Sequence, residues 1–202
     1  MSGQLFIVAA PSGAGKTSLV KALIDSMPGI MVSVSHTTRP PRPQEVDGVS
    51  YHFVDNATFN AMQSKHAFLE HATVYGNQYG TSAEWVTAQR QAGMDIILEI
   101  DCQGAEQVMR LCPEAQSVFI IPPSRAALAQ RLRDRAQDSD EVMARRLSEA
   151  ASEIKQASIF NYIIINDNFD DALAEFQAVI RASRCSLKQR SNQVTNLLAE
   201  FA

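Results

Sequence analysis

The chain has 202 residues, of which 46% are hydrophobic, and its formal net charge at pH 7 is −4. This length suits one α/β domain with small subdomains. The net negative charge does not fit the basic surface of a nucleic-acid-binding protein, so no nucleic-acid partner is expected. Every apolar run is too short to span a bilayer, so no membrane partner is expected. The three cysteines lack metal-site spacing and the sequence opens without a signal-peptide pattern, which predicts a reduced, cytoplasmic protein.

A phosphate-binding motif links the first predicted strand to the first predicted helix. The apolar run Leu5–Ala9 predicts a buried strand, and helical spacing follows over about Lys16–Ser26. Between them stands PSGAGKTS, residues 11–18, whose glycines let backbone N–H groups face a polyphosphate at a helix N-terminus. Ala10 occupies the place where this pattern usually has its leading glycine. The segment predicts a nucleoside triphosphate site.

Each residue of this motif has an expected part in binding the triphosphate. Lys16 would reach the outer phosphates, and the Thr17 hydroxyl would be a ligand of Mg²⁺. The expected triphosphate-binding residues of the loop are Pro11, Ser12, Gly13, Ala14, Gly15, Lys16, Thr17 and Ser18.

The segment His36–Ser82 does not follow a βα repeat. We expect one strand over Ile30–His36, then an extended, proline-rich stretch that places Arg39 and Arg42 on one side, where both guanidinium groups suit a phosphate. A solvated linker and a ligand for an SH3-type partner are the alternatives. Short strands and turns follow, with Asp55 and Ser82 as caps of two helices. This segment therefore resembles an inserted subdomain.

An acidic strand end follows the next helix. Residues 94–101 predict a buried parallel strand that carries Glu99 and Asp101 on one face at its carboxyl end, where open α/β sheets bind ligands. Burying a carboxylate at such a strand end costs free energy unless the carboxylate is paired or faces a metal ion. The alternatives are a strand end that emerges into solvent and, because Asp101 and Gly104 match a DxxG motif, a P-loop GTPase.

Two arginine-bearing helices follow in the second half of the chain. After a cap at Ser124, one helical face holds Leu128, Arg131, Leu132 and Arg135. The next helix carries Arg145 and Arg146 beside its packing stripe. We interpret the pair of helices as a catalytic lid, with a solvated helical hairpin as the alternative.

The C-terminal part predicts a last buried strand and a long helix. The strand is expected over Tyr162–Ile165 and the helix over about Asp170–Lys188. The stretch after Arg190 is polar and then weakly amphipathic, so it either frays or meets a partner.

Taken in order, these motifs resemble the guanylate kinase family. The match runs from about Leu5 to Arg184. Its motifs are APSGAGKT (10–17), SHTTRPPR (35–42), GVSYHF (48–53), FLEHA (68–72), YG (79–80), IDCQG (100–104) and a late strand that ends in Asn166-Asp167.

The resemblance implies a P-loop NTPase fold of the α/β class, with a central parallel sheet flanked by helices, an inserted mixed α/β GMP-binding subdomain and a helical lid. It implies transfer of a phosphoryl group from ATP to GMP in purine nucleotide metabolism, with Mg²⁺, and ATP and GMP as small-molecule partners. The sequence leaves homo-oligomerisation open. The expected domain covers residues 3–184, with core segments 3–34, 83–124 and 158–190, a GMP-binding insertion 35–82, a lid 125–157 and a tail 191–202.

The resemblance also implies roles for single residues. Lys16, Arg42, Arg135 and Arg146 would be catalytic. Asn166 and Asp167 would join the ATP site, and Thr17 and Asp101 would hold Mg²⁺, partly through water. The GMP site would comprise Ser35, Arg39, Arg42, Tyr51, Glu70, Tyr79, Gly80, Thr81, Glu99 and Asp101. Among these, Ser35, Glu70 and Thr81 would read the guanine base, while the arginines and tyrosines would grip the phosphate.

Three residues depart from the family pattern. They are Ala10, Glu99 where aspartate is common, and Ala136 where glycine is common. The GTPase alternative is disfavoured because Asn166-Asp167-Asn168 lacks the lysine of an Asn-Lys-x-Asp motif. A non-catalytic guanylate-kinase-like module that binds phosphopeptides is the other alternative, and the intact Lys16 and Thr17 argue against it.

Overall fold

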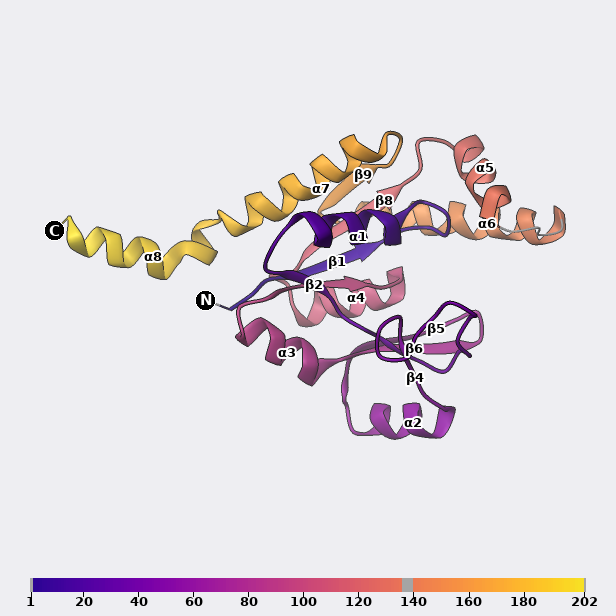
Figure 1. Cartoon of the computed structure of the whole chain (residues 1–202), viewed down its shortest axis with the longest axis horizontal. Coiled ribbons are helices and arrows are strands. Elements are labelled where there is room, and N and C mark those ends of the chain that lie inside the picture. Colours follow the sequence, from indigo (N-terminus) through magenta and orange to yellow (C-terminus); the bar gives the residue numbers. More distant parts are fainter. Residues whose placement is uncertain (1, 136–139, 202) are drawn as a thin grey trace.

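A five-stranded parallel sheet forms the centre of the molecule (Figure 1). The computed structural model describes residues 2–135 and 140–201, and in this part of the chain the strand order is β2-β7-β1-β8-β9. The strands are β1 (Leu5–Ala9), β2 (Ile30–Val32), β7 (Asp95–Glu99), β8 (Gln116–Ile121) and β9 (Tyr162–Ile165). Because β1 lies in the middle, the loop that follows it emerges at the centre of the carboxyl edge, where ligands bind in open α/β sheets.

Helices cover both faces of this sheet, which explains the continuous apolar run of β1. On one face Phe6 and Val8 pack in one cluster with residues of α1 (Lys16–Ser26) and α7 (Phe169–Arg184). On the other face Leu5 and Ile7 pack with residues of α3 (Ala83–Gln91) and α4 (Cys102–Leu111). Since both faces are buried, alternation of polar and apolar residues would be costly. The predicted α/β class with a parallel sheet is confirmed.

A second, mixed sheet is inserted between β2 and α3. Its order is β4-β3-β6-β5, formed by β3 (His36–Thr37), β4 (His52–Phe53), β5 (Phe68–Val74) and β6 (Asn77–Ser82), with α2 (Asn56–Ser64) beside it. The single strand expected over Ile30–His36 is wrong. The backbone N–H of Ser33 still bonds to Ile97 of the main sheet (2.9 Å), whereas the Ser35 carbonyl accepts from His52 of the inserted sheet (2.9 Å). The chain therefore crosses between two sheets at this point.

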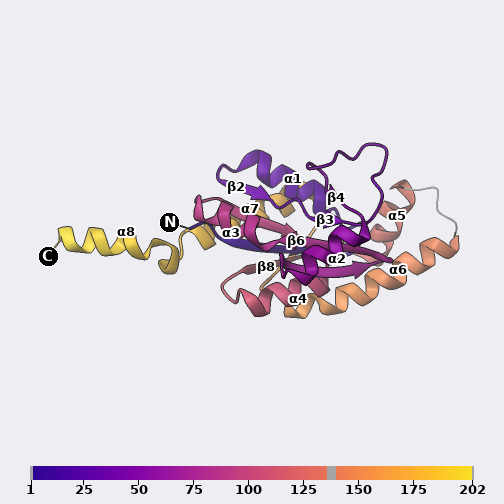
Figure 2. The ribbon, with the colours of Figure 1, turned by 90° about the horizontal axis from the view of Figure 1, so that it is seen from below.

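Two helices form the expected lid region at one end of the molecule (Figure 2). They are α5 (Arg125–Arg135) and α6 (Asp140–Lys155), and the short 3₁₀ helix η1 (Gln156–Ile159) leads to β9. Leu128, Leu132, Met143 and Ala150 form a small core of their own between the helices. Ala136, one of the departures from the family pattern, lies outside the described residues.

Two expectations for the C-terminal part are wrong. β9 is not a buried strand, because it is the edge of the sheet and only Ile164 of its four residues is buried. The long helix ends at Arg184, and a separate helix α8 (Leu187–Glu200) begins after Ser186. None of the α8 residues is buried, and Figures 1 and 2 show this helix projecting away from the body. No helix in the described ranges combines the length and the apolar character that a bilayer crossing requires.

Candidate functional site

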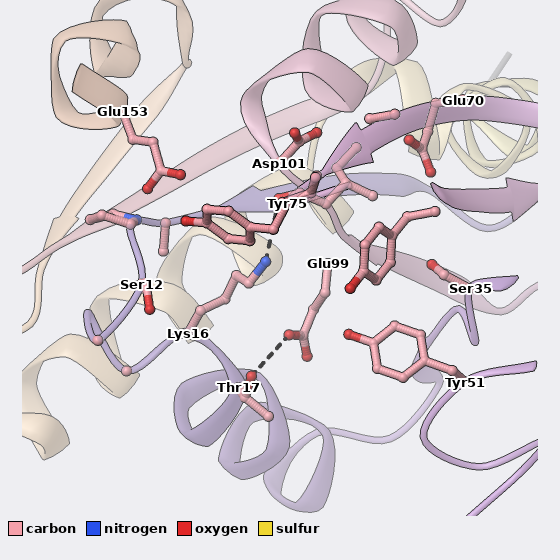
Figure 3. Close-up of a pocket in the computed structure, with 18 of the residues that line it drawn as sticks. Ser12, Lys16, Thr17, Ser35, Tyr51, Glu70, Tyr75, Glu99, Asp101 and Glu153 are labelled. Carbon is pink, nitrogen blue, oxygen red and sulfur yellow. Dashed lines mark hydrogen bonds between the residues drawn. The ribbon is translucent and has the colours of Figure 1, made fainter. Parts of the chain in front are cut away.

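A cavity of about 330 Å³ lies where the carboxyl edge of the main sheet meets the inserted sheet and α6 (Figure 3). Residues expected for the triphosphate site and residues expected for the GMP site both line it. The predicted residues in its lining are Pro11, Ser12, Gly13, Gly15, Lys16, Thr17, Ser35, Arg42, Tyr51, Glu70, Tyr79, Glu99 and Asp101. The fold thus joins two groups of residues that are far apart in the sequence.

The loop between β1 and α1 has the backbone geometry of an anion site. Gly13 and Gly15 adopt φ angles of 89° and 93°, in the left-handed region that other residues rarely adopt. A Cβ atom on Gly15 would overlap the Asn166 side chain. α1 begins at Lys16 without a side-chain cap, so no side chain competes for its first N–H groups. These N–H groups are placed for phosphate oxygens.

Lys16 extends into the cavity and lies near two carboxylates. Its Nζ donates a hydrogen bond to the Ile100 carbonyl (3.3 Å). Burial lowers the pKa of Lys16, while the negative charges of Glu99 and Asp101 oppose that shift. A bound polyphosphate would add negative charge beside the ammonium group and favour its charged form.

The two acidic residues after β7 have different positions. Glu99 ends the strand, and its Oε2 accepts a hydrogen bond from the Thr17 hydroxyl (3.3 Å). Asp101 instead caps α4, where its Oδ1 accepts from the Gly104 N–H (2.9 Å) and its Oδ2 from the Gln103 amide (3.1 Å). The expectation that Glu99 and Asp101 share one strand face is therefore wrong, because the strand has already ended. Both residues nevertheless line the cavity.

The donor chemistry beside Thr17 suits Mg²⁺. A hydroxyl and a carboxylate are hard oxygen ligands, and Mg²⁺ commonly takes one or two carboxylates and completes its shell with phosphate oxygens and water. Within residues 2–135 and 140–201 there is no group of three or more His, Cys, Asp or Glu side chains that would hold a metal ion by itself. The residues present fit an ion that arrives with a nucleotide.

Two side chains of the inserted sheet and Ser35, just before β3, form a hydrogen-bonded chain at the far wall of the cavity. Glu70 on β5 pairs with Thr81 on β6, and the Thr81 hydroxyl donates to Glu70 Oε1 (2.6 Å). The Ser35 hydroxyl lies 3.3 Å from the Thr81 hydroxyl. Glu70 is only 3% exposed, and its burial raises the pKa of the carboxyl group to about 7, with a further upward contribution from Asp101 and an opposing one from Thr81. A buried carboxylate with unused acceptor capacity is suited to a ligand that donates hydrogen bonds.

Next to this chain stand two tyrosines and two arginines. The rings of Tyr51 and Tyr79 meet edge to face, with centroids 5.9 Å apart. Arg42 lines the cavity, whereas Arg39 does not. Arg39 forms an ion pair with Glu45 (2.7 Å) and lies over the Tyr51 ring (5.4 Å to its centroid), and the hydrogen bond to Glu45 raises the pKa of Arg39. The sequence predicted that both guanidinium groups would project to one side, where they suit a phosphate. In the structure only Arg42 of the two lines the cavity, while Arg39 pairs with Glu45.

Several predicted site residues support the cavity or lie away from its lining. Asn166 is buried under the phosphate loop, and its side-chain amide donates to the Ala14 carbonyl (2.7 Å). Gly80 is also buried, and a Cβ atom there would press on the Phe68 ring. The remaining described residues outside the lining are Ser18 and Asp167, which are exposed, Ala14, which is buried, Thr81, which donates to Glu70, and Arg146 on α6. Arg135 ends α5, and its side chain lies outside the described part of the chain.

The structure adds two polar residues that sequence reasoning missed. Tyr75 stands at the tip of the β5–β6 hairpin, and its hydroxyl donates to Glu149 Oε2 on α6 (3.1 Å). Glu153 faces Lys16 from α6, and burial is the largest cause that raises the pKa of its carboxyl group. A signal for Glu153 was present, since it lies two helical turns after Arg146 and so on the same face. Ala10, Ala72, Val74 and Ile100 complete the lining.

Comparison with known proteins settles the family. The guanylate kinase family model matches residues 2–183. The chain belongs to the guanylate kinase family. It is 54% identical over 200 residues to the guanylate kinase of Pseudomonas fluorescens (strain Pf-5), covering 99% of this chain and 97% of that protein. The guanylate kinase of Saccharophagus degradans is 53% identical, with 98% and 96% covered.

A solved structure supports the same conclusion for the fold. The guanylate kinase of Anaplasma phagocytophilum superposes with a TM-score of 0.77 at 29% identity, covering 92% of this chain and 88% of that one. Membership of this family confirms the predicted P-loop NTPase fold and the predicted class of enzyme, a nucleoside monophosphate kinase. Matches over nearly the whole chain to proteins named guanylate kinase favour a catalyst over the phosphopeptide-binding module.

Proposed function

We propose that this chain transfers the γ-phosphoryl group of ATP to GMP and so produces ADP and GDP reversibly. The observation that carries this proposal is a single cavity in which a phosphate-binding loop faces the Ser35–Thr81–Glu70 chain. The loop accounts for a triphosphate, and the chain accounts for a purine with hydrogen-bond donors. The names of the full-length relatives support the same substrates.

Glu70 is the residue that we assign to guanine recognition. Guanine presents an N1–H and an exocyclic amine on one edge, and both can donate to one carboxylate. Adenine has an unprotonated N1 at the corresponding place and would leave the buried carboxylate unpaired. A site built in this way discriminates by about 10⁴-fold against a ligand that lacks the donors. Thr81 holds Glu70 in position, and Ser35 extends the polar wall.

The phosphate of GMP would lie beside Arg42, Tyr51 and Tyr79. The two hydroxyl groups and the guanidinium group provide donors in one place at the cavity wall. Arg39 contributes its positive charge from behind Tyr51, where Glu45 holds it. Glu99 and Asp101 line the cavity between the two phosphate sites.

Phosphoryl transfer at this site needs positioning and positive charge, and no covalent nucleophile. The backbone N–H groups of the loop and the Lys16 ammonium would hold the ATP phosphates, and the lid would bring Arg135 and Arg146 to the transferring group. Asn166 keeps the loop in shape through Ala14, and Asp167 follows at the end of the strand. Closure of the lid over the cavity would exclude water.

Thr17 and Glu99 are the residues that we propose to hold Mg²⁺, since they already meet through a hydrogen bond. Asp101 remains a predicted contributor through water, because both of its oxygen atoms serve the start of α4. Mg²⁺ bound together with ATP would neutralise part of the negative charge of the phosphates.

The division of the chain follows from these roles. We propose that 35–82 is the GMP-binding insertion, that 125–157 is the lid, and that the core segments 3–34, 83–124 and 158–190 carry the ATP site. Residues 191–200 of the tail 191–202 belong to α8, and none of them lines the cavity. A cytoplasmic location and participation in purine nucleotide metabolism go with this proposal.

The experiment that tests the proposal measures ADP release from Mg·ATP with GMP, AMP, CMP and UMP as separate acceptors, coupled to NADH oxidation. Strong activity with GMP alone is expected. Activity with a different monophosphate would retain the kinase and remove the guanine assignment. Folded protein that binds GMP without turnover would favour the phosphopeptide-binding module. Glu70→Gln is the matched variant, and an unchanged preference for GMP over AMP would remove Glu70 from base recognition.

A further inference from the structure

The tip of the β5–β6 hairpin has an unusual backbone. Val74 pairs with Asn77, so Tyr75 and Gly76 alone form the turn. Both have positive φ angles, 51° and 78°. Hairpin turns of this kind favour Asn or Gly at the first position, and a bulky tyrosine there is strained. The turn chemistry therefore does not explain why a tyrosine stands at this position.

Packing does not explain the presence of an aromatic ring at position 75 either. Its exposed fraction is 66%, although it lines the cavity. Figure 3 shows the ring reaching from the inserted sheet across the cavity above Lys16, toward the side where Glu153 stands. What the ring gains in this position is the hydrogen bond from its hydroxyl to Glu149 Oε2, 3.1 Å away.

Glu149 lies on α6 of the lid, between Arg146 and Glu153. It lies one helical turn after Arg146 and one turn before Glu153, so the three residues share one face of α6. Its other oxygen, Oε1, lies 3.7 Å from Arg145 Nε. The bond from Tyr75 thus ties the insertion directly to the cavity-facing side of the lid.

We propose that Tyr75 is a positioning residue that latches the insertion to α6 through Glu149. The latch sets the position of α6, which carries Arg146, relative to the phosphate site and covers the cavity with an aromatic ring. This inference rests on the proposed function, because it concerns the alignment of the lid for phosphoryl transfer to GMP. The Tyr75 side chain touches the lid and needs no contact with the reacting atoms.

Tyr75→Phe and Glu149→Ala, singly and together, test the latch, because each removes one partner of the bond. A partly exposed hydrogen bond to a charged group predicts a fall in kcat of about three- to tenfold in each single variant, with the KM for GMP and for ATP changed less than about twofold. The double variant should fall no further than the singles, because both remove the same bond. Tyr162→Phe, which removes a hydroxyl on the distant edge strand β9, should leave kcat unchanged.

A second readout does not depend on activity. Amide hydrogen exchange of the nucleotide-free protein should be faster in α6 and in the hairpin for Tyr75→Phe and Glu149→Ala, and unchanged there for Tyr162→Phe. Tyr75→Asn suits the positive φ angle, so it should keep or raise stability while kcat falls. Unchanged exchange, or single effects that multiply in the double variant, would overturn the latch. A wild-type protein that fails to phosphorylate GMP would overturn the proposed function, while the exchange measurement would still decide the latch.

Discussion

Replacement of Glu70 by glutamine gives a direct test of the physical state of the base-reading carboxyl group. In the folded protein the pKa of Glu70 is raised from 4.5 to about 7, mainly by burial. Between these two values the folded state keeps a proton that the unfolded state has released, so stability falls as the pH rises through this window and levels off above about pH 7. Glutamine has nearly the same shape and no charge to bury.

The magnitude follows from the two pKa values. At pH 8 the ionised Glu70 costs about 3 kcal/mol of folding free energy, and at pH 5 it costs less than about 1 kcal/mol. The advantage in stability of Glu70→Gln over the wild type should therefore grow by about 2.5 kcal/mol between pH 5 and pH 8. The Thr81 hydroxyl can still donate to the glutamine oxygen, so this bond is not lost.

Urea unfolding at a series of pH values measures this difference. Trp85 is the only tryptophan of the chain and packs partly buried against the core on α3, so its fluorescence follows unfolding. Glu175→Gln, at an exposed position of α7, is the matched control and should show no such trend. A stability difference between Glu70→Gln and the wild type that is independent of pH would refute the raised pKa of Glu70 and the burial that causes it.

Three further substitutions test other parts of the site. Lys16→Ala should abolish turnover while calorimetry still detects GMP binding, and loss of GMP binding would show that the two phosphate sites are misassigned. Asn166→Ala leaves the buried Ala14 carbonyl without its donor, so unfolding free energy should fall by about 1–3 kcal/mol and the KM for ATP should rise; unchanged values would remove Asn166 from the support of the loop. Arg39→Ala should raise the KM for GMP about tenfold and leave the KM for ATP unchanged, as expected for a charge beside the monophosphate alone. An equal rise in both KM values would instead indicate a general loss of structure.

Local chemistry made part of this protein predictable. The phosphate loop could be recognised because its glycines, lysine and threonine act within a few residues of one another. Helix caps behave in the same way: Asp55 accepts from the Thr58 N–H (2.7 Å) and Ser82 from the Trp85 N–H (3.3 Å), as expected. The family motifs also carried Glu70 and Thr81 correctly to one place.

Two other features depend on how the chain turns within the next few residues, which the local pattern did not reveal. Arg39 and Arg42 are each followed by a proline, yet the turn that follows them brings Glu45 to Arg39 and leaves Arg42 at the cavity. The sequence predicted that Asp101 ends a strand, whereas in the structure the strand ends at Glu99 and Asp101 caps α4. In both cases a partner several residues away, and not the local pattern, decides the direction of the side chain.

The sequence by itself determined the class of fold, the family and the site of triphosphate binding, because apolar periodicity and the loop motif are properties of contiguous residues. Only the tertiary structure decided which side chains meet across the cavity. Tyr75 and Glu149 are separated by 74 positions and belong to different segments, so neither one signals the other until the insertion and the lid lie side by side. The raised pKa of Glu70 has the same origin, since burial is a property of the packed molecule and not of a sequence motif.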